Sequence, residues 1–187
     1  MPLDSVLTDE ELVVVVRETD TERYGELIRR YQTKLTHYLR KFIRDYDALE
    51  DVLQDVFIKA YRNLYNFNIA RKFSPWIYRI AHNEALNALK KYRLESVSLD
   101  ETEWDWIDEN MDTAAGIKHI QLKGTIETGL AKLKIKYREP LILYFFEQKT
   151  YEEISDILHL PTSTVGTRIA RGKKLLQVFI NSVYGKS

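Results

Sequence analysis

The chain has 187 residues, of which 44% are hydrophobic, and its 28 basic side chains balance 28 acidic ones. It has no cysteine, which excludes a disulfide framework and a thiolate metal site. The four histidines share no ligand spacing, and no apolar run is long enough for a membrane span or a signal peptide. We therefore expect a cytoplasmic chain with no metal, no cofactor and no membrane insertion. Only 7 glycines and 4 prolines favour an all-α fold, in one domain or two small ones.

The balanced charge conceals strong segregation along the chain. Residues 45–55 hold five acids and no base, whereas residues 56–93 hold eight bases and one acid. Residues 94–117 hold eight acids and no base, and residues 118–187 hold twelve bases and six acids. Two basic blocks beside acidic segments favour a partner with fixed negative charge, such as nucleic acid, despite the zero total.

Three helices are predicted in the first half, after a short leading one. Thr8 and Glu11 form a capping-box pattern in "LTDEEL", which predicts the leading helix. Asp20 or Thr21 can open a long helix whose apolar residues keep helical spacing from Tyr24 to Ile43, before a break at residues 45–47.

The next helix is predicted over residues 49–64, with Leu49, Val52, Leu53, Val56, Phe57, Ala60, Tyr61 and Leu64 facing inward. Acids lie near its start and Lys59 and Arg62 near its end, as the helix dipole favours. A polar loop, "YNFNIARKFS", leads to a third helix from about Pro75, where Trp76 is interpreted as a core anchor.

Residues 151–176, "YEEISDILHLPTSTVGTRIARGKKLL", predict a helix-turn-helix. Thr150 and Glu153 form a capping box, residues 159–161 break the pattern, and Thr162 or Ser163 can cap the second helix. One stripe of that helix is apolar, and the other carries threonines and arginines, which suit the major groove. An ordinary helical hairpin with a solvated basic face has the same local pattern.

Longer segments carry a more specific resemblance. "DALEDVLQDVFIKAYRNLYNF" with "RKFSPWIYRIAHNEALNALKK" resembles region 2 of a bacterial RNA polymerase sigma factor. "IKYREPLILYFFEQKTYEEISDILHLPTSTVGTRIARGKKLL" resembles region 4, and the short spacer resembles the extracytoplasmic-function (ECF) class. The resemblance implies a region 2 domain at residues 1–93, an acidic linker at 94–121 and a region 4 domain at 122–187.

The resemblance also implies three sets of site residues. Docking on core polymerase falls to Asp51, Gln54, Asp55 and Ile58. Recognition and melting of the minus-ten element fall to Phe67, Asn68, Arg71, Lys72, Arg79, Asn83, Asn87, Lys90 and Lys91. The minus-thirty-five element is read by Ser163, Thr164, Thr167, Arg168, Arg171 and Lys173. The apolar residues Ile126, Leu130, Leu133 and Tyr137 and the run "LILYFF" are expected to form core and a site for the polymerase flap.

The implied function is that of a transcription initiation factor, monomeric when free, with core RNA polymerase, promoter DNA and an anti-sigma factor as partners. The linker is either a plain tether or a segment that docks in the polymerase channel, and Trp104 and Trp106 favour docking on a partner. The chain departs from the family pattern at Gly166, where a lysine or arginine is usual, and at Ala170.

Two other classes of function are weighed against this one. A conventional helix-turn-helix regulator would bind duplex DNA without polymerase, usually as a symmetric dimer. An enzyme could use the acid pairs Asp51/Asp55 or Glu152/Glu153, but neither pair has a partner base, a metal-ligand cluster or a phosphate loop beside it in sequence.

Overall fold

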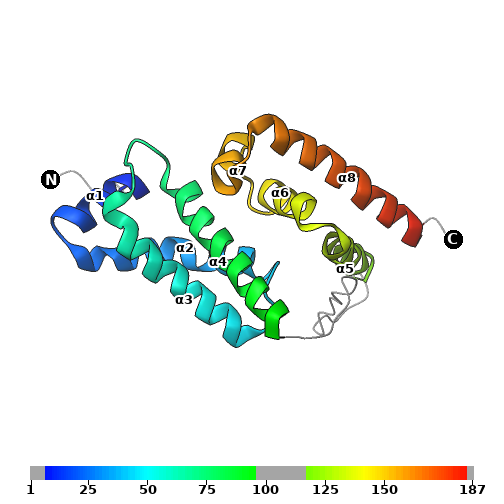
Figure 1. Cartoon of the computed structure of the whole chain (residues 1–187), viewed down its shortest axis with the longest axis horizontal. Helices are drawn as coiled ribbons and strands as arrows, with labels where there is room; N and C mark the ends of the chain where they lie inside the picture. Colours follow the sequence, from blue (N-terminus) through cyan, green and yellow to red (C-terminus); the bar gives the residue numbers. More distant parts are fainter. Residues whose placement is uncertain (1–6, 96–116, 185–187) are drawn as a thin grey trace. The chain divides into compact units, whose positions relative to one another are not determined.

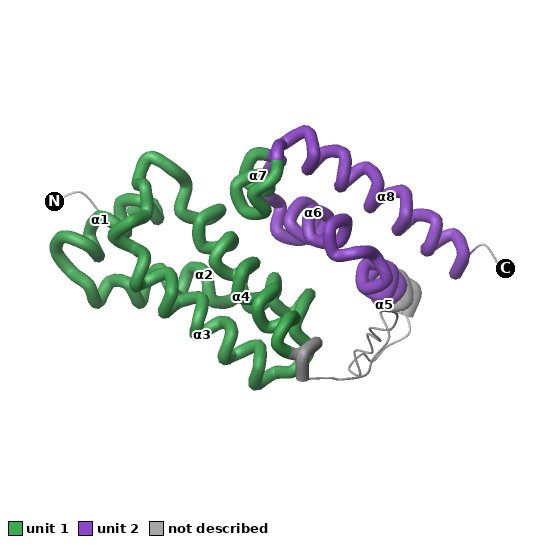
Figure 2. Tube along the Cα trace, viewed as in Figure 1, with its two compact units in different colours: residues 1–96, 152–160 green, residues 97–151, 161–187 purple. Residues whose placement is uncertain are grey.

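The computed structural model describes residues 7–95 and 117–184, and every regular element in those two ranges is a helix. The all-α prediction is therefore confirmed. The chain divides into two compact units, one formed by residues 1–96 with 152–160 and the other by 97–151 with 161–187 (Figure 2). No helix in the described ranges is long and apolar enough to cross a membrane.

The first unit begins with helix α1 (Asp9–Glu18) and the 3-10 turn η1 (Thr21–Arg23). The predicted capping box is confirmed: the Glu11 amide donates to Thr8 Oγ1 at 3.2 Å, and the Thr8 amide donates to the Glu11 carboxylate at 2.8 Å. Asp20 caps η1 by accepting from the Glu22 amide at 3.1 Å. Both α1 and η1 therefore begin where a nearby side chain caps the first free amides.

Helix α2 (Tyr24–Leu39) is shorter than its apolar spacing predicts. The chain turns after Leu39 through tight bonds, among them Phe42 N–H to the Leu39 carbonyl at 2.9 Å. Phe42 and Ile43 nevertheless remain buried, at 2% and 4% exposure. The apolar spacing therefore predicted correctly which residues are buried, but the last two of them lie beyond the end of the helix.

Helix α3 (Tyr46–Asn63) begins inside the predicted break, because the Asp45 carboxylate caps it by accepting from the Ala48 amide at 2.8 Å. The 3-10 turn η2 (Leu64–Asn66) follows, and α4 (Phe73–Glu95) starts two residues before Pro75. Tyr61 was expected inside, but its side chain is 46% exposed. Val52 and Leu53 are only half-buried.

Helices α2, α3 and α4 pack on one another, and α1 packs against α2 and α4 (Figure 1). Large side chains from all four helices fill the shared core, including Leu12, Leu27, Leu35, Tyr38, Val56, Phe73 and Ile77. This small bundle holds the outer faces of α3 and α4 on a common rigid support.

The remaining helices are α5 (Ile117–Lys132), α6 (Ile135–Phe145), α7 (Tyr151–Leu158) and α8 (Thr162–Tyr184). Helix α8 packs on α5 and α6, around a core that includes Leu130, Leu141, Ile142, Leu143, Val165 and Ile169. Helices α4 and α5 extend into both ends of the linker expected at 94–121. The middle of that linker, with Trp104 and Trp106, lies outside the described residues.

Candidate functional site

One face of α3 carries the four side chains expected to dock on polymerase. Asp51, Gln54, Asp55 and Ile58 follow an i, i+3, i+4, i+7 spacing, so they lie on one side of the helix. All four are exposed, and Ile58 is 40% exposed. The opposite side of α3 is buried through Ala48, Leu49, Val56, Phe57 and Ala60. The helix therefore presents to solvent an acidic surface with an apolar residue, Ile58, at its C-terminal end.

The loop between η2 and α4 presents Asn68, Arg71 and Lys72, all of them exposed. Asn68 also shapes the loop: its side-chain oxygen accepts from the Ala70 amide at 2.9 Å, and its carbonyl accepts from the Arg71 amide at 2.9 Å. This is the local turn that asparagine favours, and it projects the two basic side chains outward.

Phe67 does not lie on this surface, contrary to the expectation that it contacts DNA. It is 4% exposed, and its ring centroid lies 5.6 Å from that of Phe73 and 5.1 Å from that of Trp76. A buried ring cannot stack on a base, and offset and edge contacts of this kind stabilise a core. We therefore reassign Phe67 to the hydrophobic core. The same contacts agree with the interpretation of Trp76 as a core anchor.

Helix α4 carries a polar stripe. Arg79, Asn83, Asn87 and Lys90 succeed one another at spacings of four, four and three residues, and Lys91 follows. Arg79 is half-buried and the other four are exposed. Ile77, Ala81 and Ala85 hold the opposite side in the core. The stripe combines two amides, which can pair with base edges, and three cations, which can bind phosphates.

His82 lies between these residues in sequence but points into the core. Its side chain is 8% exposed and its Nδ1 lies 3.4 Å from the Tyr38 hydroxyl. Burial lowers the pKa of His82 to about 4, so the imidazole stays neutral at pH 7. Its role is structural.

The turn between α7 and α8 differs in detail from the prediction. Helix α7 ends at Leu158 because His159 adopts a left-handed conformation, with φ of 52°. The Leu160 amide then donates to the Ser155 carbonyl at 3.2 Å, which is the hydrogen bond of a Schellman cap. The Pro161 carbonyl accepts from the Val165 amide at 3.0 Å, so α8 starts directly after Pro161, and Thr162 and Ser163 lie in its first turn.

A shallow hollow of about 290 Å³ lies along the outer face of α8. Five of the six expected residues line it: Ser163, Thr164, Thr167, Arg168 and Arg171. Lys173 is not among them, and its Nζ lies 5.7 Å from the centre of the Phe145 ring. The opposite face of α8 is buried through Val165, Ile169 and Gly172.

Two further residues line the hollow that the sequence did not indicate, Lys136 and Tyr137 of α6. A hydrogen bond from Arg171 lowers the pKa of the Tyr137 hydroxyl, and the positive charges of Lys136 and Arg171 act in the same direction. Tyr137 was expected in the core because its spacing follows Leu130 and Leu133. Its ring is only half-buried, and its hydroxyl belongs to the polar hollow.

Gly166 of α8 faces the Tyr151 ring, and this neighbour favours a residue without a side chain. A Cβ at this position would lie 3.3 Å from the Tyr151 ring, closer than ordinary contact. A lysine or arginine here would therefore require the Tyr151 ring to shift by a few tenths of an ångström.

Two charged side chains of α6 that follow Lys136 and Tyr137 in sequence are buried. Arg138 and Glu139 are each 7% exposed. Burial raises the pKa of Glu139 to about 7, while the nearby charges of Arg138 and Arg168 oppose the rise. Elsewhere too, the described residues form no cluster of three or more acids or histidines that could hold a metal ion.

Comparison with known proteins identifies related chains. The family model described as Sigma-70 region 2 matches residues 27–95, and the one described as Sigma-70, region 4 matches residues 123–176. The sequence is 30% identical over 171 residues to the ECF RNA polymerase sigma factor SigW of Bacillus subtilis, covering 87% of this chain and 91% of that one. It is 31% identical over 182 residues to the ECF RNA polymerase sigma-E factor of Escherichia coli K12, covering 91% and 93%.

Solved structures show the same fold at lower identity. The structure of CnrH in complex with the cytosolic domain of CnrY matches with a TM-score of 0.70 and 22% identity, over 93% of this chain and 97% of that one. The sigma factor RpoE in complex with the anti-sigma factor NepR, from Bartonella quintana, matches with a TM-score of 0.65 and 18% identity, over 84% and 96%.

Proposed function

The chain belongs to the extracytoplasmic-function class of bacterial RNA polymerase sigma factors, and we propose which of its surfaces perform each part of that function. It is a transcription initiation factor that binds core RNA polymerase and directs it to promoters, where the DNA is recognised and melted. This membership decides against a conventional regulator that binds duplex DNA without polymerase. The factor works by binding energy alone, and its work on the chromosome places it in the cytoplasm.

The observation that carries the assignment of surfaces is the pairing of two exposed faces on one bundle. The acidic face lies on α3 and the amide and basic stripe lies on α4, and these two helices pack on each other (Figure 1). The first suits a basic surface of the polymerase, because charge steers the approach and Ile58 adds apolar contact. The second suits an opened DNA strand, because amides can pair with base edges while cations bind phosphates.

For the minus-ten element we propose Asn68, Arg71, Lys72, Arg79, Asn83, Asn87, Lys90 and Lys91, without Phe67. For the minus-thirty-five element we propose Ser163, Thr164, Thr167, Arg168 and Arg171, with Lys136 and Tyr137 of α6 added because they line the same hollow. Lys173 remains a candidate for a phosphate at the edge of this surface. Both sets fit the general division between contacts that position a protein on DNA and contacts that read bases.

The domain assignment follows the same division. Residues 1–93 bind core polymerase and melt the minus-ten element, residues 122–187 read the minus-thirty-five element, and residues 94–121 connect them. A monomer of this kind needs an asymmetric partner, the core polymerase, and no second copy of itself. A protein of the anti-sigma kind, as in the complexes of CnrH and RpoE, is the expected inhibitor.

Charge reversal on α3 tests the docking surface. Asp55→Lys should abolish co-elution with core RNA polymerase in gel filtration and should leave the helical circular dichroism unchanged, because Asp55 is exposed. The matched control is Glu22→Lys, the same charge change at an exposed residue of η1, and it should co-elute normally. Normal co-elution of Asp55→Lys would remove α3 from the interface. Failure of the wild-type chain to co-elute, or to support run-off transcription, would remove the function itself.

A further inference from the structure

Helix α1 bonds to both ends of the loop that precedes α4. At the loop's start, the Arg17 guanidinium donates to the Leu64 carbonyl at 2.8 Å and to the Phe67 carbonyl at 2.5 Å. At its end, the Glu10 carboxylate accepts from the Phe73 amide at 2.7 Å. The Tyr65 hydroxyl also donates to the Arg17 carbonyl at 3.1 Å. Each contact reaches across 47 to 63 residues of sequence.

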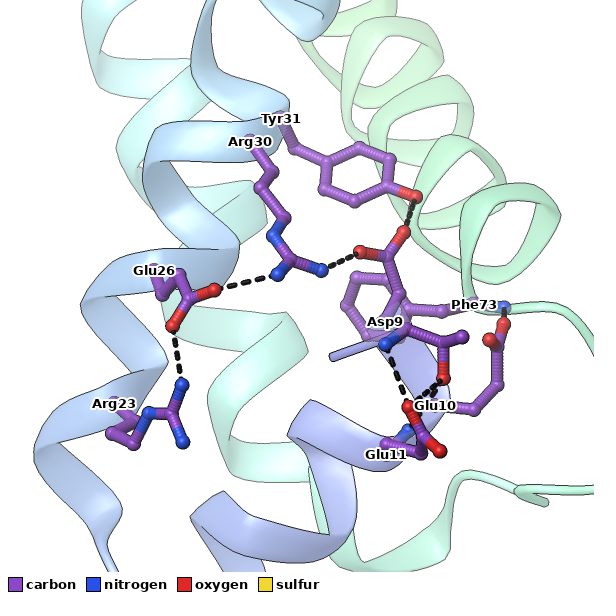
Figure 3. A network of polar contacts seen from close by, with 9 residues as sticks. Asp9, Glu10, Glu11, Arg23, Glu26, Arg30, Tyr31 and Phe73 are labelled. Carbon is purple, nitrogen blue, oxygen red and sulfur yellow. Dashed lines mark hydrogen bonds and ion pairs between the residues drawn. The ribbon is translucent and has the colours of Figure 1, made fainter. Parts of the chain in front are cut away.

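Helix α1 is itself firmly mounted, so it can act as a fixed support. Leu12, Val13 and Val16 are buried at 0%, 0% and 2% exposure. Asp9 accepts from Arg30 of α2 at 2.7 Å and also accepts from the Tyr31 hydroxyl. Figure 3 shows Asp9 and Glu10 as neighbours with different partners: Asp9 meets α2, and Glu10 meets the start of α4.

The bonds satisfy backbone groups that the loop would otherwise leave to water. The first amides of a helix have no partner within it, and a carboxylate there also complements the helix dipole. Glu10 supplies such a carboxylate to α4 from a different helix. The Arg17 guanidinium binds the carbonyls of Leu64 and Phe67, at the two ends of η2. The backbone is thus held at both ends, while Asn68, Arg71 and Lys72 between them stay exposed.

We propose that Glu10 and Arg17 are positioning residues that hold residues 65–72 and the start of α4 in the conformation that receives the opened minus-ten strand. They touch no DNA in this scheme. They lower the entropic cost of DNA binding, because a loop that is already ordered loses less conformational freedom when the strand binds. The inference rests on the proposed assignment of this loop and α4 to the minus-ten element. Both residues lie outside the region matched by the region 2 family model, which begins at residue 27.

The test compares variants in one helix that differ in whether they touch the loop. Glu10→Ala and Arg17→Ala remove the two supports, whereas Glu10→Gln keeps an acceptor for the Phe73 amide. Glu11→Ala is the matched control, because it removes the neighbouring carboxylate and breaks the capping box without any bond to the loop. All variants are made in the full chain, and circular dichroism together with amide exchange in α3 confirms that each one folds.

The first measurement is hydrogen exchange of amides 65–73 in the free protein. We expect about tenfold faster exchange in Glu10→Ala and Arg17→Ala, a smaller change in Glu10→Gln, and the wild-type rate in Glu11→Ala, since exchange reports local opening. The second measurement is the affinity of the holoenzyme for a fluorescent single-stranded oligonucleotide. Its sequence is the non-template minus-ten strand of a promoter on which the wild type is active. We expect about a tenfold loss of this affinity in Glu10→Ala and Arg17→Ala, a smaller loss in Glu10→Gln and none in Glu11→Ala.

Three outcomes would overturn the inference. Unchanged exchange in Glu10→Ala and Arg17→Ala would show that α1 does not order the loop. Faster exchange with unchanged oligonucleotide affinity would show that loop order does not matter for the strand. Equal losses of oligonucleotide affinity in Glu11→Ala and Glu10→Ala would show that α1 only stabilises the fold and does not position the loop. If the wild-type holoenzyme does not bind the oligonucleotide, the proposed function fails, and the exchange data still decide whether α1 holds the loop.

Discussion

At the scale of single residues, Asn83 is the sharpest test of how this factor opens DNA. Its amide is exposed on the polar stripe of α4, and an amide both donates to and accepts from a base edge. Asn83→Ala should keep core binding but lose transcription from closed promoters, because unstacking a base costs a few kcal/mol that the protein must offset. On a template that is already mismatched across the minus-ten element, the run-off yield of Asn83→Ala should return most of the way to the wild-type yield.

The control for this prediction is Asn181→Ala, the same change at an exposed position of α8 outside the proposed interfaces. It should match the wild type on both templates. If Asn83→Ala opens closed promoters as well as the wild type, the base-binding group lies elsewhere on α4.

His82 makes the stability of the first unit depend on pH. Its folded pKa is lowered from 6.5 to about 4, so between those values the unfolded chain takes up a proton that the folded chain refuses. The contribution is therefore fully present above pH 6.5 and is lost as pH falls toward 4. By the usual conversion, the shift corresponds to about 3 kcal/mol.

Urea unfolding of the full chain at pH 7.5 and pH 5 measures this effect. His82→Gln should show a smaller decrease in the free energy of unfolding between the two pH values than the wild type. His37→Gln, at an exposed histidine, should keep the wild-type decrease. An unchanged decrease in His82→Gln would exclude His82 as the source.

The residues that sequence reasoning found and missed differ in one physical respect. Asn83 and Arg171 were implied by the family resemblance, and both side chains are exposed, as the periodicity of their helices predicts. Lys136 and Tyr137 were missed because they meet Arg171 from another helix. Phe67 was misplaced because an aromatic residue in a polar segment gives no local sign of whether its ring turns inward. Contacts between residues that are dozens of positions apart cannot be predicted from the spacing of residues within one helix.

At the scale of elements, α8 depends on Gly172 for its approach to α6. A Cβ at Gly172 would lie 2.8 Å from Leu141 Cδ1 and 3.2 Å from the Tyr137 carbonyl oxygen. The second neighbour is backbone, which cannot turn aside as a side chain can. Gly172→Ala should therefore lower the free energy of unfolding by about 1–3 kcal/mol, as overpacking usually does.

Gly124→Ala is the matched control for Gly172→Ala. No heavy atom lies within 4 Å of the position its Cβ would take on α5, so the better helix propensity of alanine should dominate. Thermal unfolding should then move in opposite directions for the two variants. A stabilised Gly172→Ala would show that α6 and α8 are more loosely packed than the structure describes.

Element boundaries were predictable where a side chain caps the helix and less so where tertiary packing decides. The predicted start at Thr8 is confirmed because its capping bonds are local, whereas Asp20 caps only the 3-10 turn η1 and the long helix α2 starts at Tyr24 without a side-chain cap. The end of α2 was predicted four residues late, because Phe42 and Ile43 continue the apolar spacing into a turn. The end of α7 depends on the left-handed backbone of His159, which the residue type alone does not specify.

At the scale of the whole molecule, the segregated charge gives the linker a predicted role. Residues 94–117 carry eight acids and no base, and they lie between two basic blocks. Changing Asp100, Glu101, Glu103, Asp105, Asp108 and Glu109 to their amides should lower run-off transcription more than it lowers the free energy of unfolding. The deficit should shrink as salt is raised, because salt screens charge interactions in the wild type as well.

Equal transcription by this variant and the wild type at low salt would support a plain tether. Such a result would leave the proposed surfaces on α3, α4 and α8 untouched, since none of the six acids lies on them.

The contact between Tyr151 and Gly166 sets an order in which descendants of this factor can change promoter preference. A basic residue at position 166 would add a cation to the helix proposed to read the minus-thirty-five element, but its Cβ would lie 3.3 Å from the Tyr151 ring. The accessible path runs through a smaller residue at 151 first, followed by the new side chain at 166. The reverse order passes through an intermediate in which the Tyr151 ring must shift by a few tenths of an ångström. Substitutions at these two positions should therefore be epistatic, and lineages that carry a bulky residue at 166 should also carry a small one at 151.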